Sequence, residues 1–339
     1  GGNPVAAWPD QKRTQAAMKR LELLVTIDPE MSATAKLAHY VIAPRLSFEQ
    51  PGLTLPVESL AAYAYTMGYE QPYAQYAPQL VDPPAGSDVI EEWQFFYGLA
   101  ARMGLTLSLE SAFPWIASGE RAAPVVLDME HAPTTDALLE LLTQGSRIPL
   151  AEVRAHPHGH VFDDLTVTVG PKDPACTARL ELADPVMLAE LDEVARESGT
   201  TAPGFAFRLI SRRLPDVYNS YGRSIPRLVR KHRHNPAFLH PDDLRELGVA
   251  PGDIVEIHSG HDSILGVAEA DGGLRRGVVS MTHAFGDLHG PNDETEARQA
   301  GSNTGRLIPV DRDFDPYTGI PRMSAVPVEV RRFAGSASR

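Results

Sequence analysis

The first residues of the chain have types and spacing that suit the binding of a diphosphate. They are Gly1, Gly2, Asn3 and Pro4. Because glycine lets the backbone come close to a diphosphate and a helix N-terminus attracts anions, a helix predicted at 10–20 would complete an anion site. Asp28 ends the next apolar run, where a carboxylate could accept hydrogen bonds from a ribose or a base. The pattern indicates a dinucleotide site, although an ordinary turn followed by a strand-terminal aspartate gives the same residues.

Three other groups of residues could bind metals or anions. His156, His158 and His160 alternate in a loop with proline and glycine, where a joint between domains is favoured over a metal site. The basic stretch 223–234 could meet phosphates, but a solvated face is the preferred interpretation. Cys176 is interpreted as an ordinary structural thiol. We therefore assign no catalytic residue and no metal ligand.

The composition is that of a globular protein with an acidic balance. The 339 residues carry a net charge of −13 and are 43% hydrophobic. General nucleic-acid binding needs clustered Lys and Arg, so this class of partner is not expected. A single cysteine excludes an internal disulfide and a cysteine-built metal site. No apolar run approaches the roughly 18 residues of a membrane span, and we take the cytoplasm as the expected location.

Residues 1–204 alternate between strand-like and helix-like patterns. The apolar runs 21–27 and 40–43 are typical of strands, and a short helix is expected between them. This order predicts a Rossmann-like parallel α/β domain, interrupted by irregular excursions of which 50–86 is the longest. Further helices are expected at 88–103, with Ser87 as its cap, at 135–144, and from Asp184-Pro185 onward.

Residues 205–339 have a different pattern, with short strands at near-regular spacing and tight turns. Strands are expected at 205–210, 253–258, 263–270 and 277–282. A short helix, 240–248, has proline near its start and glycine at its end. This pattern predicts a small β-barrel as the second domain.

Several sequence motifs of the first domain resemble those of the third domain in the dimethyl-sulfoxide-reductase superfamily of molybdopterin oxidoreductases. They are the Gly-Gly-Asn-Pro loop, the strand that ends in Asp28, the Ser-Ala-Thr-Ala run that contains Thr34, and Tyr-Val-Ile-Ala-Pro at 40–44. Ala33 and His39 depart from the family, which commonly has Glu and Asp there. The resemblance implies that Asp28 binds the guanosine end of a dinucleotide, and that the remaining contacts come from Gly1, Gly2, Asn3, Pro4 and Thr34.

The second domain resembles the last domain of the same superfamily, a six-stranded double-psi β-barrel that covers the pterin. The similar phrase runs from Asn235-Pro236 through Leu247-Gly248 to Gly252-Asp253. The loop from Asn303 to Leu307 is longer than the commonest form in the family. The resemblance implies cofactor contacts at Arg212, Asn219, Ser220, Asn235, His283, Asn303 and Arg322.

The resemblance implies the cofactor-binding C-terminal part of a bis-molybdopterin guanine dinucleotide oxidoreductase that uses molybdenum or tungsten. A 4Fe-4S cluster is expected only in an upstream domain, and we expect the natural polypeptide to extend upstream of Gly1. The expected partners are that cluster-bearing domain or subunit and an electron-transfer protein. Alone, the chain is expected to be inert.

Three alternatives remain open at this point. The chain could be a non-catalytic homologue that has lost the metal, or a separate subunit that docks onto a cluster-bearing partner. It could also be a nucleotide-binding protein outside this family.

Overall fold

The computed structural model of the chain contains two compact units. Unit 1 consists of Gly1–Val41 and Glu181–Arg339, and unit 2 of Ile42–Leu180. The predicted domain division between residues 204 and 205 stays a prediction. No helix in the described part of the chain has the length and apolarity needed to cross a membrane. The structure describes residues 2–54, 73–110, 123–144, 148–162, 173–196, 204–223, 225–229, 233–288 and 293–335.

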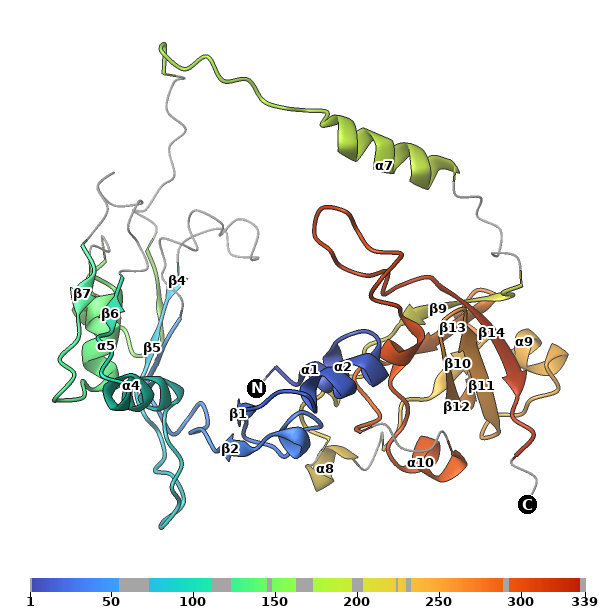
Figure 1. Ribbon diagram of the computed structural model, residues 1–339, viewed down its shortest axis with the longest axis horizontal. Coiled ribbons are helices and arrows are strands. Elements are labelled where there is room, and N and C mark those ends of the chain that lie inside the picture. The colour runs from blue at the N-terminus through green and yellow to red at the C-terminus, as the bar shows by residue number, and fades with distance from the viewer. Residues whose placement is uncertain are drawn as a thin grey trace. The chain divides into compact units, whose positions relative to one another are not determined.

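Unit 1 contains a closed barrel of six strands, which confirms the barrel predicted for the second half of the sequence (Figure 1). The order around the barrel is β10-β12-β11-β14-β9-β13. The β9–β13 and β10–β12 pairs are parallel, and the other four pairs are antiparallel. The strands are β9 (Phe207–Ser211), β10 (Ala237–Leu239), β11 (Ile254–Ser259), β12 (Ser263–Ala270), β13 (Val278–Met281) and β14 (Val326–Arg332).

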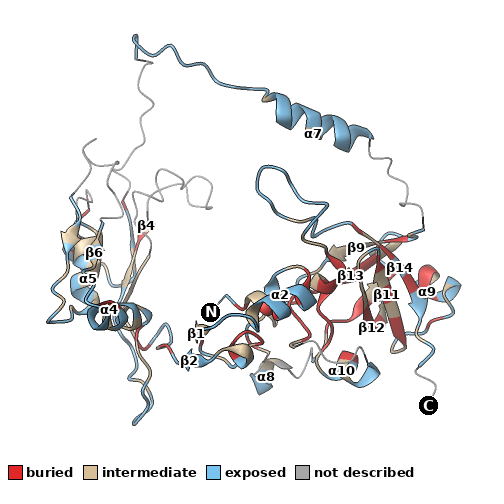
Figure 2. Ribbon diagram, viewed as in Figure 1, coloured by how far each residue is buried: buried red, intermediate tan, exposed pale blue. Residues whose placement is uncertain are grey.

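The barrel encloses a core of buried apolar residues. Figure 2 shows much of the barrel ribbon in the colour of buried residues. Burial alternates along β14, so one face of that strand lines the core. Strand β12 is buried over most of its length, because α10 (Glu294–Gln299) helps to cover its outer face through Ala297. The barrel therefore forms a firm base for the loops at its ends. Its fully buried inner residues are Ala237, Leu239, Val255, Ile257, Ile264, Ala268, Val279, Leu307 and Val328.

Residues 2–41, which we call the N-terminal segment, also belong to unit 1. Asp10 caps the predicted helix by accepting a hydrogen bond from Arg13 N at 3.2 Å. The two strands of this region pair only with each other. Its elements are α1 (Pro4–Ala7), α2 (Gln11–Met18), β1 (Val25–Ile27), the 3-10 helix η1 (Ala35–Leu37) and β2 (Tyr40–Ile42).

The remaining helices of unit 1 come before or between the barrel strands in the sequence. Asp184 caps α7 through Val186 N and Met187 N, at 2.9 and 3.1 Å, so the helix predicted at Asp-Pro is confirmed. His240 caps α9 in the same way, since its ring accepts a hydrogen bond from Asp242 N. The helices are α7 (Pro185–Arg196), α8 (Pro226–Val229), α9 (Pro241–Glu246) and the 3-10 helix η3 (Thr304–Leu307).

The described residues of unit 2 form short antiparallel strand pairs and three helices. Its small core contains Ala74, Ile148, Leu150, Val153 and Phe162. The paired strands are β3 (Gly52–Leu53) with β5 (Tyr76–Ala77), β4 (Tyr73–Ala74) with β8 (His160–Val161), and β6 (Ser108–Leu109) with β7 (Val125–Val126). The helices are α4 (Glu92–Arg102), α5 (Thr135–Leu142) and α6 (Leu150–Arg154).

The Rossmann-like arrangement predicted for the first 204 residues is not confirmed. The described strands of this region are two or three residues long and pair only in two-stranded sheets. A parallel α/β sheet needs apolar strands that are covered on both faces. Tyr40 and Val41 in β2 are instead exposed, and β1 is only half-buried. The apolar residues of this region therefore did not predict which positions are buried.

The helix predicted at 88–103 begins later than expected. Its cap is Glu91 rather than Ser87, and Glu91 forms a reciprocal capping box with Gln94. The preceding residue, Ile90, is extended because its N–H donates to Ala43 O at 3.2 Å and its carbonyl accepts from Arg45 N at 2.8 Å. Pairing with this neighbouring segment thus delays the start of the helix.

Candidate functional site

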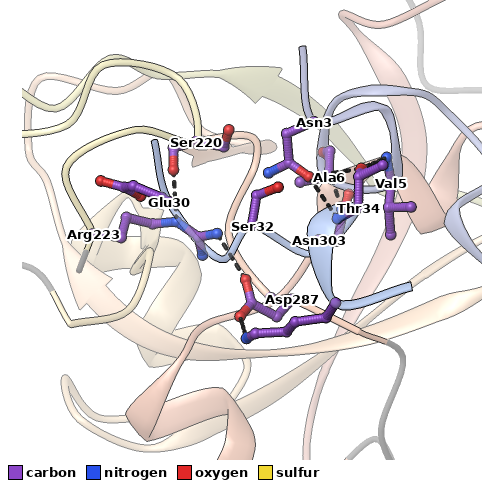
Figure 3. Close-up of polar contacts among 12 residues, drawn as sticks. Asn3, Val5, Ala6, Glu30, Ser32, Thr34, Ser220, Arg223, Asp287 and Asn303 are labelled. Atoms are coloured by element: carbon purple, nitrogen blue, oxygen red, sulfur yellow. Dashed lines mark hydrogen bonds and ion pairs between the residues drawn. The ribbon is translucent and has the colours of Figure 1, made fainter. Parts of the chain in front are cut away.

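The N-terminal segment is joined to the barrel by hydrogen bonds between buried groups. Asp10 N donates to Gly305 O at 2.7 Å and to Ile308 O at 3.0 Å. The Asn303 amide donates to Ala6 O at 3.1 Å, across 297 residues of sequence (Figure 3). The structure therefore places the first loop of the chain against the late loop of the barrel.

A buried polar network reinforces this contact. Gln11 donates from Nε2 to Gly286 O at 3.1 Å and to Asp287 O at 2.6 Å, while its Oε1 accepts from Arg306 Nε at 2.8 Å. Arg306 is only 4% exposed. Burial lowers the pKa of its guanidinium, and the nearby carboxylates of Glu296 and Asp262 offset part of that effect. The network fixes the backbone of residues 286–287 against helix α2.

Asn3 has an unused hydrogen-bond donor at the surface of a cavity. Its Oδ1 accepts from Thr34 N at 3.2 Å and from Thr34 Oγ1 at 3.0 Å. Because a backbone N–H can only donate, this contact identifies the oxygen end of the amide. The other end, Nδ2, is buried and has no partner among the described residues. In Figure 3 this nitrogen points to the side where Ser32, Ser220 and Arg223 lie.

We call the space beside Asn3 the cationic cavity, with a volume of about 240 Å³. It contains three cationic and two acidic side chains. The N-terminal segment contributes Asn3, Glu30, Met31, Ser32 and Lys36, and the rest of unit 1 contributes Ser220, Arg223, Arg233, Asp287, Gln299 and Ala300. Two segments distant in sequence thus form one site with an excess of positive charge, which suits an anionic ligand.

Asp287 forms ion pairs with two of the three cations. Its carboxylate lies 2.5 Å from Lys36 Nζ and 2.9 Å from Arg223 NH2 (Figure 3). Burial raises the pKa of Asp287, but the hydrogen bond from Lys36 and the charge of Arg223 outweigh it and leave the pKa lowered. A carboxyl with a depressed pKa stabilises the fold above its unfolded pKa, and loses that contribution as the pH falls through its folded value. The double ion pair is therefore intact at neutral pH.

A second space, the barrel-mouth cavity, has a volume of about 300 Å³. It is lined by Ala6, Ala7, Leu209, Ile210, Ser211, Met281, His283, Asn303, Thr304, Gly305, Ile308, Met323 and Ser324. This lining joins α1 of the N-terminal segment to the ends of β9 and β13. The cavity is mainly apolar, with a few polar groups from His283, Asn303 and Ser211, as expected where a flat organic ring binds.

His283 can take part in this cavity as a neutral imidazole. Burial, followed by the positive charge of Arg213, lowers its pKa, so it is uncharged at pH 7. Its Nε2 lies 3.3 Å from Asn219 Oδ1, which already accepts a hydrogen bond from Arg213 NH1 at 2.5 Å. Since that oxygen is an acceptor, the imidazole proton belongs on Nε2, and Nδ1 faces Ser211 Oγ at 3.5 Å.

The family model described as the Molydopterin dinucleotide binding domain matches residues 207–327. This range contains strands β9 to β13 and the beginning of β14. Residues 207–327 are a molybdopterin dinucleotide-binding domain of the dimethyl-sulfoxide-reductase family. The cationic cavity and the barrel-mouth cavity both include residues of this domain and of the N-terminal segment.

Comparison with curated proteins extends the likeness over most of the chain. Acetylene hydratase of Syntrophotalea acetylenica is 22% identical over an alignment of 336 residues that covers 95% of this chain and 41% of that protein. The dimethyl sulfoxide/trimethylamine N-oxide reductase of Rhodobacter capsulatus is 23% identical over 321 residues, covering 87% of this chain and 36% of the reductase. The chain thus spans about two fifths of the length of these relatives.

A solved structure shows the same fold. Acetylene hydratase from Pelobacter acetylenicus superimposes with a TM-score of 0.57 and 18% sequence identity. The match covers 98% of this chain and 43% of the hydratase. It supports a mixed α/β fold with a closed barrel at the C-terminal end.

Four predicted contact residues line the two cavities, and a fifth contacts one of these four. Asn3 and Ser220 line the cationic cavity, while His283 and Asn303 line the barrel-mouth cavity. Asn219 contacts His283 and adopts a left-handed backbone with φ 55°. Cofactor contact at these five positions stays a prediction.

Other predicted residues shape the loops rather than line a cavity. Asp28 uses one oxygen to accept from Glu30 N at 3.0 Å and the other to accept from Ser32 Oγ at 2.7 Å. It thereby positions two residues of the cationic cavity. Thr34 holds Asn3 and accepts from Val5 N at 3.1 Å. Pro4 is the first residue of α1, Gly2 is exposed, and Gly1 lies outside the described residues.

Asn235 has its amide fully engaged in structural contacts. It is 1% exposed, donates to Thr282 O at 2.6 Å and Ser302 O at 2.9 Å, and accepts from Ser302 N at 2.9 Å. These bonds tie the end of β13 to the Asn303 loop. The described contacts therefore give Asn235 a structural role next to the barrel-mouth cavity.

Two predicted arginines of the molybdopterin dinucleotide-binding domain lie outside both cavities. Arg212 forms an ion pair with Asp271 and stacks over the Phe238 ring at 4.0 Å. Arg322 lines a separate space of about 550 Å³ beside α7, together with acidic residues such as Asp315. A role for either arginine at the cofactor stays a prediction.

Sequence reasoning missed Lys36, Arg223 and Asp287 as residues of one site. Arg223 belongs to the basic stretch noted at 223–234, which was interpreted as a solvated face. Asp287 is 251 residues from Lys36 and 64 residues from Arg223. No local pattern could have shown this arrangement, because it depends on how the N-terminal segment folds onto the barrel.

The histidine run in unit 2 forms a ring stack. His156 and His160 stack with centroids 4.0 Å apart, and Phe162 meets the His160 ring edge-on. The described part of the chain contains no group of three or more His, Cys, Asp or Glu residues arranged to hold a metal. Cys176 is exposed.

Proposed function

We propose that the N-terminal segment and the barrel together bind one molybdopterin guanine dinucleotide in a bis-cofactor enzyme of molybdenum or tungsten. The main support is the cationic cavity, in which both parts present donors to a shared space. The amide nitrogen of Asn3, Nδ2, also supports a ligand site, because it is a buried donor without a partner among the described residues and buried donors are normally satisfied. The residues present fit an anionic dinucleotide.

Different residues would hold different parts of the cofactor. Lys36, Arg223 and Arg233 would bind the diphosphate, with Asn3 donating a hydrogen bond beside them. His283 and Asn303 would meet the polar edge of the pterin in the barrel-mouth cavity. Asp28 would act mainly through the loop that it holds. When bound, the cofactor supplies the metal-based chemistry, while the chain supplies position and charge.

Catalysis would need protein beyond these residues. The relatives are more than twice as long as this chain, and the single cysteine cannot bind a cluster. We propose that the chain is inert alone and acts with a 4Fe-4S-bearing domain or subunit and an electron-transfer partner. The expected activity is an oxidoreductase activity, since two reductases are among the relatives.

We also propose the double-psi arrangement for the barrel and a diverged Rossmann-like origin for the first part of the chain. The combination of parallel and antiparallel neighbours in the barrel supports the first assignment. The second rests on the resemblance of the first residues, from the Gly-Gly-Asn-Pro loop to Tyr-Val-Ile-Ala-Pro at 40–44, to the third domain of the dimethyl-sulfoxide-reductase superfamily.

Replacing Asn3 tests the proposed site. Asn3 has φ 44°, so Asn3→Gly keeps the backbone conformation while removing the unpartnered Nδ2 donor, together with the oxygen that accepts from Thr34. Guanosine diphosphate is the probe, because it carries the base, ribose and diphosphate of the dinucleotide. We expect the variant to bind the probe about tenfold more weakly than the wild-type chain, the loss expected for one hydrogen bond to a charged group, measured by titration calorimetry.

Asp313→Gly is the matched control, because Asp313 is also left-handed (φ 55°), is exposed, and does not line the cationic cavity. Its affinity for the probe should equal that of the wild type. Equal affinities for the wild type and Asn3→Gly would remove Asn3 from the site. An absence of binding by the wild-type chain would count against the proposed function itself.

A further inference from the structure

Asp287 places a negative charge inside the cationic cavity. Its carboxylate bridges Lys36 on the N-terminal segment and Arg223 on the barrel side, at 2.5 and 2.9 Å (Figure 3). The remaining cation, Arg233, has no ion-pair partner among the described residues and is exposed. Two of the three cationic groups of the cavity are therefore already paired with a residue of the chain.

The backbone on either side of this carboxylate is held in place. Gln11 binds the carbonyls of Gly286 and Asp287, as described above. Gly286 has φ +65° and lies so close to the barrel loop that an added Cβ would be 2.8 Å from Asn303 N. The side chain of Asp287 is thus the part of this loop that can move, and it is 35% exposed.

A diphosphate and the Asp287 carboxylate would compete for the same donors. Lys36 and Arg223 cannot keep their short contacts with Asp287 and also bind a second anion along the same directions. Two anions held in one small cavity also repel each other, and the repulsion is stronger than in bulk water because the cavity is partly buried. Binding of a diphosphate along the directions that Asp287 uses therefore requires the carboxylate to move away.

We propose that Asp287 is a resident counter-anion, which pairs with Lys36 and Arg223 in the empty protein and is displaced when the diphosphate binds. This inference rests on the proposed function, because it assumes that the cavity takes a diphosphate. In the empty protein the double ion pair keeps the N-terminal segment docked on the barrel side of the cavity. Asp287 therefore lowers the affinity for the cofactor while preserving the geometry of its site.

The test compares Asp287→Asn with the wild-type chain, again with guanosine diphosphate as the probe. The substitution keeps the size of the side chain and removes its charge, so we expect the probe to bind about tenfold more tightly. The melting temperature of the empty variant should fall, and saturating probe should raise it by more than it raises that of the wild type. Asp287→Ser gives a smaller uncharged side chain should the amide variant fail to fold.

Asp262→Asn is the matched control. Asp262 also pairs with a cation of the N-terminal segment, Lys12 at 2.7 Å, but it does not line the cationic cavity. This variant also removes one negative charge, and it should bind the probe like the wild type. A gain of affinity confined to the Asp287 variants would support the inference.

Two other outcomes would contradict the inference about Asp287. If the wild type binds the probe and both Asp287 variants bind it equally well or less well, Asp287 is a fixed structural partner. The inference then fails while the proposed function stands. If no form of the chain binds the probe, both are overturned.

Discussion

Replacing Gly301 with alanine should unfold the barrel under conditions in which the wild-type chain stays folded. Gly301 has φ +75°, a conformation that strains any residue with a Cβ. The added Cβ would overlap the Asn235 side-chain oxygen and lie 2.9 Å from Asn235 N. Asn235 cannot retreat, because its amide already holds three backbone groups around Thr282 and Ser302. We expect a loss of about 4 kcal/mol or more in the free energy of unfolding.

Denaturant unfolding, followed by hydrogen exchange of amides in β11 and β12, measures this loss for the barrel itself. Gly319→Ala is the control, since Gly319 has a similar φ of +69° but open space around its would-be Cβ. It should cost only the backbone strain, about 1 kcal/mol. Equal losses in the two variants would mean that the tight packing of Gly301 against Asn235 has been misassigned.

Replacing Gln11 with methionine should release the N-terminal segment from the barrel. The change keeps the volume of the side chain but leaves the buried Arg306 Nε and the carbonyls of Gly286 and Asp287 without their partner. An unsatisfied guanidinium is costly to bury, so we expect a loss of about 3 kcal/mol in the docking of this segment. Faster hydrogen exchange at the amides of α2 and at Val5, with the barrel strands unchanged, would report it.

Gln15→Met provides the comparison within the same helix. Gln15 is also buried, at 5% exposure, but its Nε2 has no partner among the described residues. Exchanging an unsatisfied amide for an apolar side chain of the same size should be neutral or stabilising. If Gln11→Met is tolerated as well as Gln15→Met, the Arg306 network does not hold the segment in place.

The barrel could be predicted from sequence because its signals are local. The strands 253–258 and 263–270 have apolar residues bounded by glycine and aspartate turns, and the structure has β11 and β12 within one residue of them. The start of α7 followed from Asp184 and Pro185, whose capping chemistry acts within three residues. Turn and helix-cap signals of this kind can be recognised in the sequence without knowledge of the fold.

The first part of the chain was harder to predict, because its strands are short and partly exposed. Burial of β1 and β2 depends on neighbours from elsewhere, and apolar letters alone suggested a larger sheet than the described residues contain. The same limitation applies to the site. Asn235 lies in a sequence motif that resembles a cofactor-binding motif. Its amide hydrogen bonds instead join two barrel loops, and only the folded structure reveals these contacts.

We expect the N-terminal segment and the barrel to bind one dinucleotide together. Hydrogen exchange of the full chain, with and without saturating guanosine diphosphate, tests it most directly. We predict slower exchange at both sides of the cationic cavity, in residues 30–37 of the N-terminal segment and in residues 220–223 and 299–303 of the barrel side. Protection confined to one of the two sides, or protection of neither, would contradict it.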